Sequence, residues 1–357
     1  MAQKPIWKRL KYKNIAVVLI ALVLVIVIIS SACSRLAGSL DKKNKEKNNS
    51  KNSSNISVED SGNQSKDPNA TLNENTLDKN YRYESISNDD HLYSGDLLLI
   101  NSEFAYKSGT PSEMESSYDY RVDTDGNRIM SIKDSSVTAK KVVLQNLNRM
   151  LSDLRKAKDI SDVMLVSGYR TEEYQKTLYD NNLASTGLDY STTIEIPGHS
   201  EHHSGYAVDF QLDQTNYPIF SGTGDYSWVV DNCYKYGFIL RYQSDKSGIT
   251  GIDNESWHYR YVGVPHAQII YNDKLCLEEY ITHIKQYTRE KPYYLNSDDG
   301  TRYAIYYVAK NEGDSTNVDI PLFDNGAEYD YSISGNNCDG FIVTINISTG
   351  QVEKTAE

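Results

Sequence analysis

Four of the seven histidines lie in two short segments that also contain acids and tryptophan, residues 197–209 and 255–263. A catalytic zinc site needs three ligands of the histidine and carboxylate type, a fourth position open to water, and a nearby carboxylate that can take the proton of that water. The two segments supply such a set, with three ligands and one base: His202, Asp209, His258 and Glu255. These residue types indicate metal-assisted hydrolysis.

The first segment must bend to bring its two ligands together. Asp209 lies on a predicted strand, residues 205–210, and shares a face of that strand with Ala207. His202 comes seven residues before Asp209 and can join it only if the chain turns between them. Gly205 supplies the turn, because glycine is free of the usual φ restriction.

A second predicted strand, residues 257–262, carries His258, and we expect Glu255 to come from the chain just before it. The other expected elements are strand-like runs at 97–100 and 163–166 and helices at 143–154, 171–182, 226–236 and 277–287. They predict an α+β fold in which helices pack on one side of a small antiparallel sheet and the zinc site lies on the other face. Residues 81–289 would form this domain, and residues 290–357 a β-rich C-terminal extension.

Three short motifs follow one another along the chain: Ser167-Gly168-Tyr169-Arg170, Ser200-x-His202-x-x-Gly205-x-Ala207-x-Asp209 and Glu255-x-Trp257-His258. Together with residues 237–242, Lys246 and residues 249–251, they resemble the VanY-type zinc D-alanyl-D-alanine carboxypeptidases, which are LAS-type metallopeptidases of peptidoglycan. The resemblance covers about residues 97–287. Each motif alone is short, but three in the family's order with consistent gaps argue against a chance match.

The resemblance implies a role for each matching position. Zinc would be held by His202, Asp209 and His258, with Glu255 as the catalytic base. Arg170 would face the reacting carbonyl, where a permanent planar cation can hold an oxyanion or the product carboxylate. The remaining positions are Gln175 and Ser200, as contacts for the terminal carboxylate or backbone of the peptide, and Trp257, as an apolar wall. His199 and His203 flank the first ligand and stay open as alternative metal ligands.

The sequence thus predicts a zinc D,D-carboxypeptidase that removes the terminal D-alanine of peptidoglycan stem peptides, in wall remodelling or glycopeptide resistance. An L,D-carboxypeptidase and an endopeptidase remain alternatives within the same chemistry. A dipeptidase acting on free dipeptide in the cytoplasm is disfavoured by the expected membrane tether. A catalytically silent wall-binding module is a further alternative, against which the intact Glu255 counts.

The N-terminal residues, up to about residue 80, predict export of the rest of the chain. A basic tail at 1–14 precedes an apolar segment at 15–32, which is long enough for a membrane anchor or a signal segment, and Cys33 offers a lipoprotein attachment point instead. The basic flank stays in the cytoplasm, so we expect a single-pass membrane protein with an extracytoplasmic domain, held by a disordered Lys/Asn/Ser-rich tether at 33–80. The net charge of −12 includes five N-terminal bases, so the rest carries −17, which disfavours nucleic acid as a partner.

Overall fold

The computed structural model describes residue 77 and residues 80–348, which belong to one compact unit spanning Lys66–Glu357. The expected basic tail, the apolar segment at 15–32, Cys33 and nearly all of the expected tether lie outside the described residues. Within the described part of the chain, no helix has the length and apolar character needed to cross a membrane.

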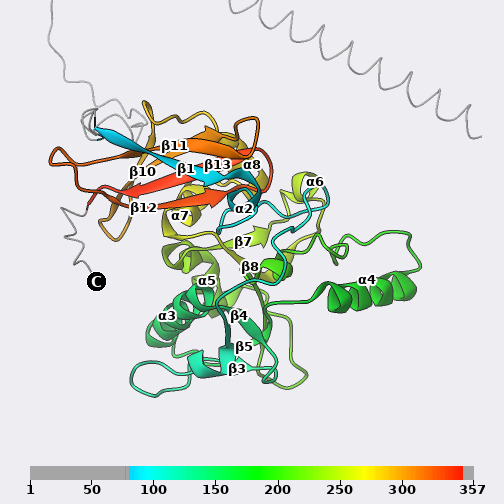
Figure 1. The fold of residues 1–357 in the computed structure, drawn as a ribbon. Coiled ribbons are helices and arrows are strands. Elements are labelled where there is room, and N and C mark those ends of the chain that lie inside the picture. Colours follow the sequence, from blue (N-terminus) through cyan, green and yellow to red (C-terminus); the bar gives the residue numbers. More distant parts are fainter. Residues whose placement is uncertain (1–76, 78–79, 349–357) are drawn as a thin grey trace, which may run out of the picture. The chain divides into compact units, whose positions relative to one another are not determined.

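A five-stranded sheet forms the centre of the catalytic region (Figure 1). Its strands, in spatial order, are β3 (Ser131–Ile132), β5 (Val163–Ser167), β6 (Ala207–Leu212), β8 (Glu255–Tyr261) and β7 (Phe238–Tyr242). All neighbours are antiparallel except β3 and β5, which run parallel. The expected small antiparallel sheet is therefore confirmed in its main part, with one parallel edge.

Helix α3 (Lys141–Lys158) covers one face of this sheet. Its apolar side packs in the same buried core as alternate residues of β6 and β8, including Val208, Phe210 and Tyr259. Since successive side chains of a strand point to opposite faces, Asp209 and His258 lie on the face away from α3. The alternation predicted from the sequence is what separates the apolar face from the polar one.

Helices also lie on the polar face, which the predicted arrangement did not include. Helices α7 (Val264–Asp273) and α8 (Leu277–Ile284) share a second core with Ile239 of β7. Arg241, two residues further along β7, reaches Glu278 of α8. Helices therefore flank both faces of the sheet.

The other helices correct the predicted ranges in detail. Helix α4 (Glu172–Thr186) begins after Thr171, whose side chain accepts a hydrogen bond from the Tyr174 N–H, and runs four residues past the predicted end. The single helix predicted at 226–236 is three short helical pieces: η4 (Gly224–Tyr226), α5 (Ser227–Asn232) and η5 (Cys233–Tyr236). The short elements that remain are α2 (Asn88–His91), η2 (Ser117–Tyr120), η3 (Glu201–Ser204), α6 (Ser247–Thr250) and the paired strands β2 (Met114–Ser116) and β4 (Thr138–Lys140).

Strands predominate in residues 293–346, which are called the C-terminal module here. Four strands pair in the order β12 (Asp330–Gly335), β13 (Gly340–Asn346), β10 (Arg302–Ala309) and β9 (Tyr293–Asn296). The module also takes in β1 (Tyr81–Ser87), which pairs antiparallel with β11 (Ser315–Pro321). The N-terminal end of the predicted catalytic domain thus belongs structurally to the C-terminal module (Figure 1).

The segment at 97–100, predicted to be a strand, is buried but irregular. Its backbone is satisfied by the C-terminal module instead of a sheet neighbour: the Leu99 N–H donates to the Asn336 carbonyl, 3.1 Å away, and the Asn337 amide donates to the Leu99 carbonyl at 2.8 Å. On its other side, Arg260 of β8 donates to the Leu98 carbonyl at 2.9 Å. The sequence predicted a strand because the side chains of this segment are apolar and buried. Its backbone hydrogen bonds, however, do not form the ladder of a β-sheet.

Candidate active site

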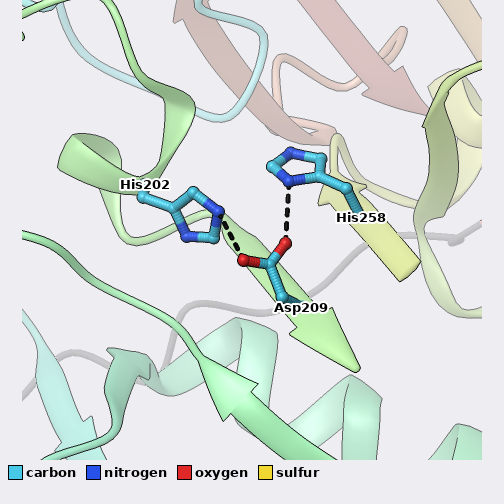
Figure 2. Close-up of side chains that lie close together, drawn as sticks. All are labelled: His202, Asp209 and His258. Atoms are coloured by element: carbon cyan, nitrogen blue, oxygen red, sulfur yellow. Dashed lines mark hydrogen bonds and ion pairs between the residues drawn. The ribbon is translucent and has the colours of Figure 1, made fainter. Parts of the chain in front are cut away.

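Three side chains from three elements converge on one point (Figure 2): His202 from η3, Asp209 from β6 and His258 from β8. Asp209 and His258 face each other in the register of the two strands. The chain turns from η3 into β6 at Gly205, whose φ of +72° belongs to the left-handed region that favours glycine. A Cβ at Gly205 would lie 2.8 Å from the Met114 sulfur, so the predicted bend also needs the absence of a side chain.

The free atoms of these side chains suit a metal ion. The Nδ1–H of His202 donates to the Gly168 carbonyl at 2.6 Å, which turns Nε2 toward Asp209 Oδ2 at 3.1 Å. His258 Nδ1 lies 2.9 Å from Asp209 Oδ1. Possible ligand atoms of the three residues all lie within 4.8 Å of one another, whereas ligand atoms of a tetrahedral zinc site lie about 3.4 Å apart. His202 Nε2 is buried without a hydrogen bond, as expected of a metal ligand.

Charges around the ligands keep Asp209 ionised. Burial opposes its ionisation, but His202 and the Arg170 guanidinium outweigh this effect and hold the Asp209 pKa well below its usual range. For His258, burial opposes protonation, yet the carboxylates of Asp209 and Glu201 beside its two ring nitrogens raise its pKa to about 10. The site therefore offers an ionised carboxylate between two imidazoles, a set of ligand types that suits a zinc ion.

Glu255 lies beside the three ligand residues in a cavity of about 230 Å³. It is the first residue of β8, so the expectation that it precedes the strand is wrong, and its Oε2 lies 3.8 Å from His258 Nδ1. Burial raises the Glu255 pKa to about 8, with Glu195 and Asp209 adding to the rise. A carboxyl whose pKa lies near neutrality can both take and return a proton.

Arg170 and Trp257 line the same cavity. The guanidinium of Arg170 bonds Asp209, and its Nε donates to Ser167 Oγ at 2.8 Å. Its third contact is Nη1 to Gln175 Oε1 at 3.3 Å. Arg170 therefore both contacts the ligand residue Asp209 and forms part of the cavity wall.

Gln175 and Ser200 do not line the cavity, although both adjoin it through Glu195. The Gln175 amide donates to the Glu195 carbonyl at 2.8 Å, and Ser200 Oγ lies 3.4 Å from the Glu195 carboxylate. Both side chains are fully buried. Their direct contact with a substrate therefore stays a prediction, and what the structure shows is a supporting position behind Glu195.

The two alternative ligands do not join the ligand group. His203 Nδ1–H donates to the Arg170 carbonyl at 2.8 Å, and its Nε2 accepts the Gly198 N–H at 3.1 Å, so both ring nitrogens serve the backbone. His199 Nδ1 bonds the Asn101 carbonyl at 2.7 Å. Among the described residues, the metal-ligand cluster contains neither of them.

Two acids of the site were not singled out from the sequence. Glu201, next to His202, is buried and faces His258 from behind. Glu195 lines the cavity and accepts a hydrogen bond from the Tyr242 hydroxyl at 2.9 Å. The position of Glu201 inside the histidine motif was a usable signal, whereas Glu195 lies in a loop whose course no local pattern predicts.

Comparisons with known proteins identify the family of this chain. The family model VanY, D-alanyl-D-alanine carboxypeptidase, matches residues 136–264. A D-alanyl-D-alanine carboxypeptidase of Enterococcus faecium is 34% identical over 78% of this chain and 82% of its own length. The bifunctional D-Ala-D-Ala dipeptidase and carboxypeptidase VanXYC of Enterococcus gallinarum is 42% identical over 36% of this chain and 71% of its own. The crystal structure of the vancomycin resistance D,D-dipeptidase VanXYg, in complex with a D-Ala-D-Ala phosphinate analogue, covers 74% of this chain and 99% of its own at 31% identity, with a TM-score of 0.64. The chain therefore belongs to the VanY family of D-alanyl-D-alanine carboxypeptidases.

Proposed function

We propose that this chain is a zinc-dependent D,D-carboxypeptidase that hydrolyses the terminal D-Ala-D-Ala bond of peptidoglycan stem peptides. The observation that carries the proposal is the single cavity that holds His202, Asp209 and His258 beside the buried Glu255. The relatives named above act on D-Ala-D-Ala according to their names, which supports the choice of substrate.

The residues divide the work as follows. His202, Asp209 and His258 hold zinc, which when bound supplies a water molecule that is acidic enough to react near neutral pH. Glu255 takes the proton of the attacking water and passes it to the nitrogen of the departing D-alanine. Its burial keeps the carboxyl basic enough for the first transfer and acidic enough for the second.

Arg170 and Trp257 shape the cavity around the reacting bond. The guanidinium balances Asp209 and offers positive charge to an oxygen that becomes negative during the reaction. Trp257 provides an apolar surface for the small methyl groups of the two D-alanines. Gln175 and Ser200 hold Glu195, which lines the same cavity as Glu255.

The experiment is mass spectrometry of muropeptides incubated with the full-length chain and zinc, with a chelator as control. Loss of one alanine from the pentapeptide alone, abolished by the chelator, is the expected result. Cleavage of the tetrapeptide would assign the L,D class, cleavage within a crosslink would assign an endopeptidase, and release from free D-Ala-D-Ala would assign a dipeptidase.

Glu255→Gln distinguishes an enzyme from a wall-binding module. The amide cannot take a proton from water, so turnover should fall about 10²- to 10⁴-fold while zinc content stays unchanged. Equal turnover of variant and parent would contradict the role given to Glu255.

We also propose that the chain works outside the cytoplasm, tethered by residues 15–32 or through Cys33. Its role would then be to trim stem peptides in the wall, which serves remodelling or glycopeptide resistance. Protease treatment of intact cells checks this location: the C-terminal module should be cleaved while a cytoplasmic marker survives.

A further inference from the structure

Four charged side chains form a network behind the ligand residues, three of them buried and the last partly buried: Glu201, Arg241, Arg260 and Glu278. Glu201 Oε1 accepts hydrogen bonds from Arg241 Nε and from Arg260 Nη1, each at 2.8 Å. Arg241 also makes a two-pronged contact with Glu278 of α8, at 2.9 and 2.7 Å. The mechanism proposed above uses none of these groups.

Burying charge is expensive unless each group is paired and hydrogen-bonded, and a hydrophobic cluster of equal volume is often as stable. In this network the two arginines are well satisfied, since Arg260 also donates to the Asp96 and Leu98 carbonyls at 2.9 Å. The exception is Glu201 Oε2, which is buried without a hydrogen bond. It lies 3.5 Å from His258 Nε2, which is also buried without a hydrogen bond.

These two atoms therefore face each other, and Glu201 is held in place by the arginines at its other oxygen. The opposite ring nitrogen of His258, Nδ1, faces Asp209 at 2.9 Å. A neutral imidazole that gives one nitrogen to a metal carries its proton on the other, and an acceptor at that proton fixes the tautomer and the ring plane. His202 has such an acceptor in the Gly168 carbonyl at 2.6 Å.

We infer that Glu201 is the positioning residue for His258. Glu201 orients the His258 ring so that Nδ1 is free to bind the metal and Nε2–H points to the Glu201 carboxylate. The inference rests on the proposed zinc function. Arg241 and Arg260 hold the Glu201 carboxylate in place through its other oxygen, so the acceptor that faces His258 is a side-chain carboxylate, whereas the one that faces His202 is a backbone carbonyl.

The test compares Glu201→Gln with Glu278→Gln in the full-length chain. Both variants remove one carboxylate partner of Arg241, but only the first removes the acceptor at His258. We expect the zinc dissociation constant, measured by competition with a chromophoric chelator and without substrate, to rise about 10- to 100-fold for Glu201→Gln. Glu278→Gln should stay within about threefold of the parent, and equal affinities for Glu201→Gln and the parent would overturn the inference.

A second measurement needs no variant. Long-range ¹⁵N–¹H correlation spectra of the zinc-loaded parent, with labelled histidine, report which nitrogen of His258 carries the proton. We expect a protonated Nε2 with a downfield, hydrogen-bonded proton, and a protonated Nδ1 would overturn the inference even if Glu201→Gln failed to fold. Because neither readout uses turnover, a chain that bound zinc as expected but left D-Ala-D-Ala uncleaved would refute the proposed function alone.

Discussion

The buried carboxyl of Glu255 should make the metal-free protein lose stability as the pH rises. Its pKa is raised from 4.5 to about 8, chiefly by burial. The unfolded chain releases this proton near pH 4.5, whereas the folded chain keeps it until about pH 8. Between these values the unfolded state binds fewer protons, so the free energy of unfolding falls with increasing pH. The contribution of Glu255 to the free energy of unfolding is therefore fully present below pH 4.5 and lost above pH 8.

The size of this loss in the free energy of unfolding follows from the shift in the Glu255 pKa. Each pKa unit corresponds to about 1.4 kcal/mol, so Glu255 alone accounts for a loss of up to about 5 kcal/mol between pH 4.5 and pH 8. Glu255→Gln removes the titrating group and should flatten the pH profile by that amount. His258, whose pKa is raised to about 10 with Glu255 among the causes, titrates together with Glu255, so the difference between the two profiles reports Glu255 and its effect on His258.

Urea unfolding in the presence of a chelator, at half-unit steps from pH 4.5 to pH 8.5, measures both profiles. Glu173→Gln is the matched control, because the side chain of Glu173 is exposed on α4. The control should follow the parent. A Glu255→Gln profile parallel to that of the parent would refute the argument that burial sets the proton affinity of this carboxyl.

Three further predictions concern the metal ligand Asp209, the side chain of Arg170 and the hydrogen bonds of Asn337 in the C-terminal module. Asp209→Asn should remove zinc from the purified protein, as measured by metal analysis, and full occupancy would contradict the ligand assignment. Arg170→Lys keeps the charge but cannot reproduce the three contacts of the guanidinium, so kcat/KM should fall about 10- to 100-fold at unchanged zinc content; a parent-like value would contradict its role. Asn337→Ala removes the donor to one buried and one partly buried carbonyl, those of Leu99 and Ala105, and should lower the free energy of unfolding by about 1–3 kcal/mol, as measured by urea unfolding; an unchanged value would contradict this role of the amide.

The parts of the site that the sequence predicted are those that local rules determine. The spacing of His202, Gly205 and Asp209 requires a turn into a strand, and the structure has that turn and that strand. Helix α3 follows from its apolar periodicity, and α4 from the cap at Thr171. Each of these features depends on residues within one element, so a pattern in the sequence is enough.

The features that the sequence did not predict depend on distant residues. Glu201 contacts His258 only because β8 lies beside β6, and no spacing along the chain encodes that pairing. Residues 97–100 are apolar like a strand, but their backbone bonds residues near 336 instead of a neighbouring strand. The positions of Gln175 and Ser200 behind Glu195 depend likewise on the course of a loop.

The pairing of β1 with β11 has a consequence for the order of folding during synthesis. Asn88, the residue that follows β1, accepts a hydrogen bond from Thr316 at 2.6 Å, across 228 positions of sequence. At a synthesis rate of about 5–20 residues per second, β1 waits roughly 10–45 s for its partner. Contacts of such long range also slow folding itself. The first strand of the described residues therefore stays unpaired through most of the synthesis of the described chain, and its backbone is exposed during that time.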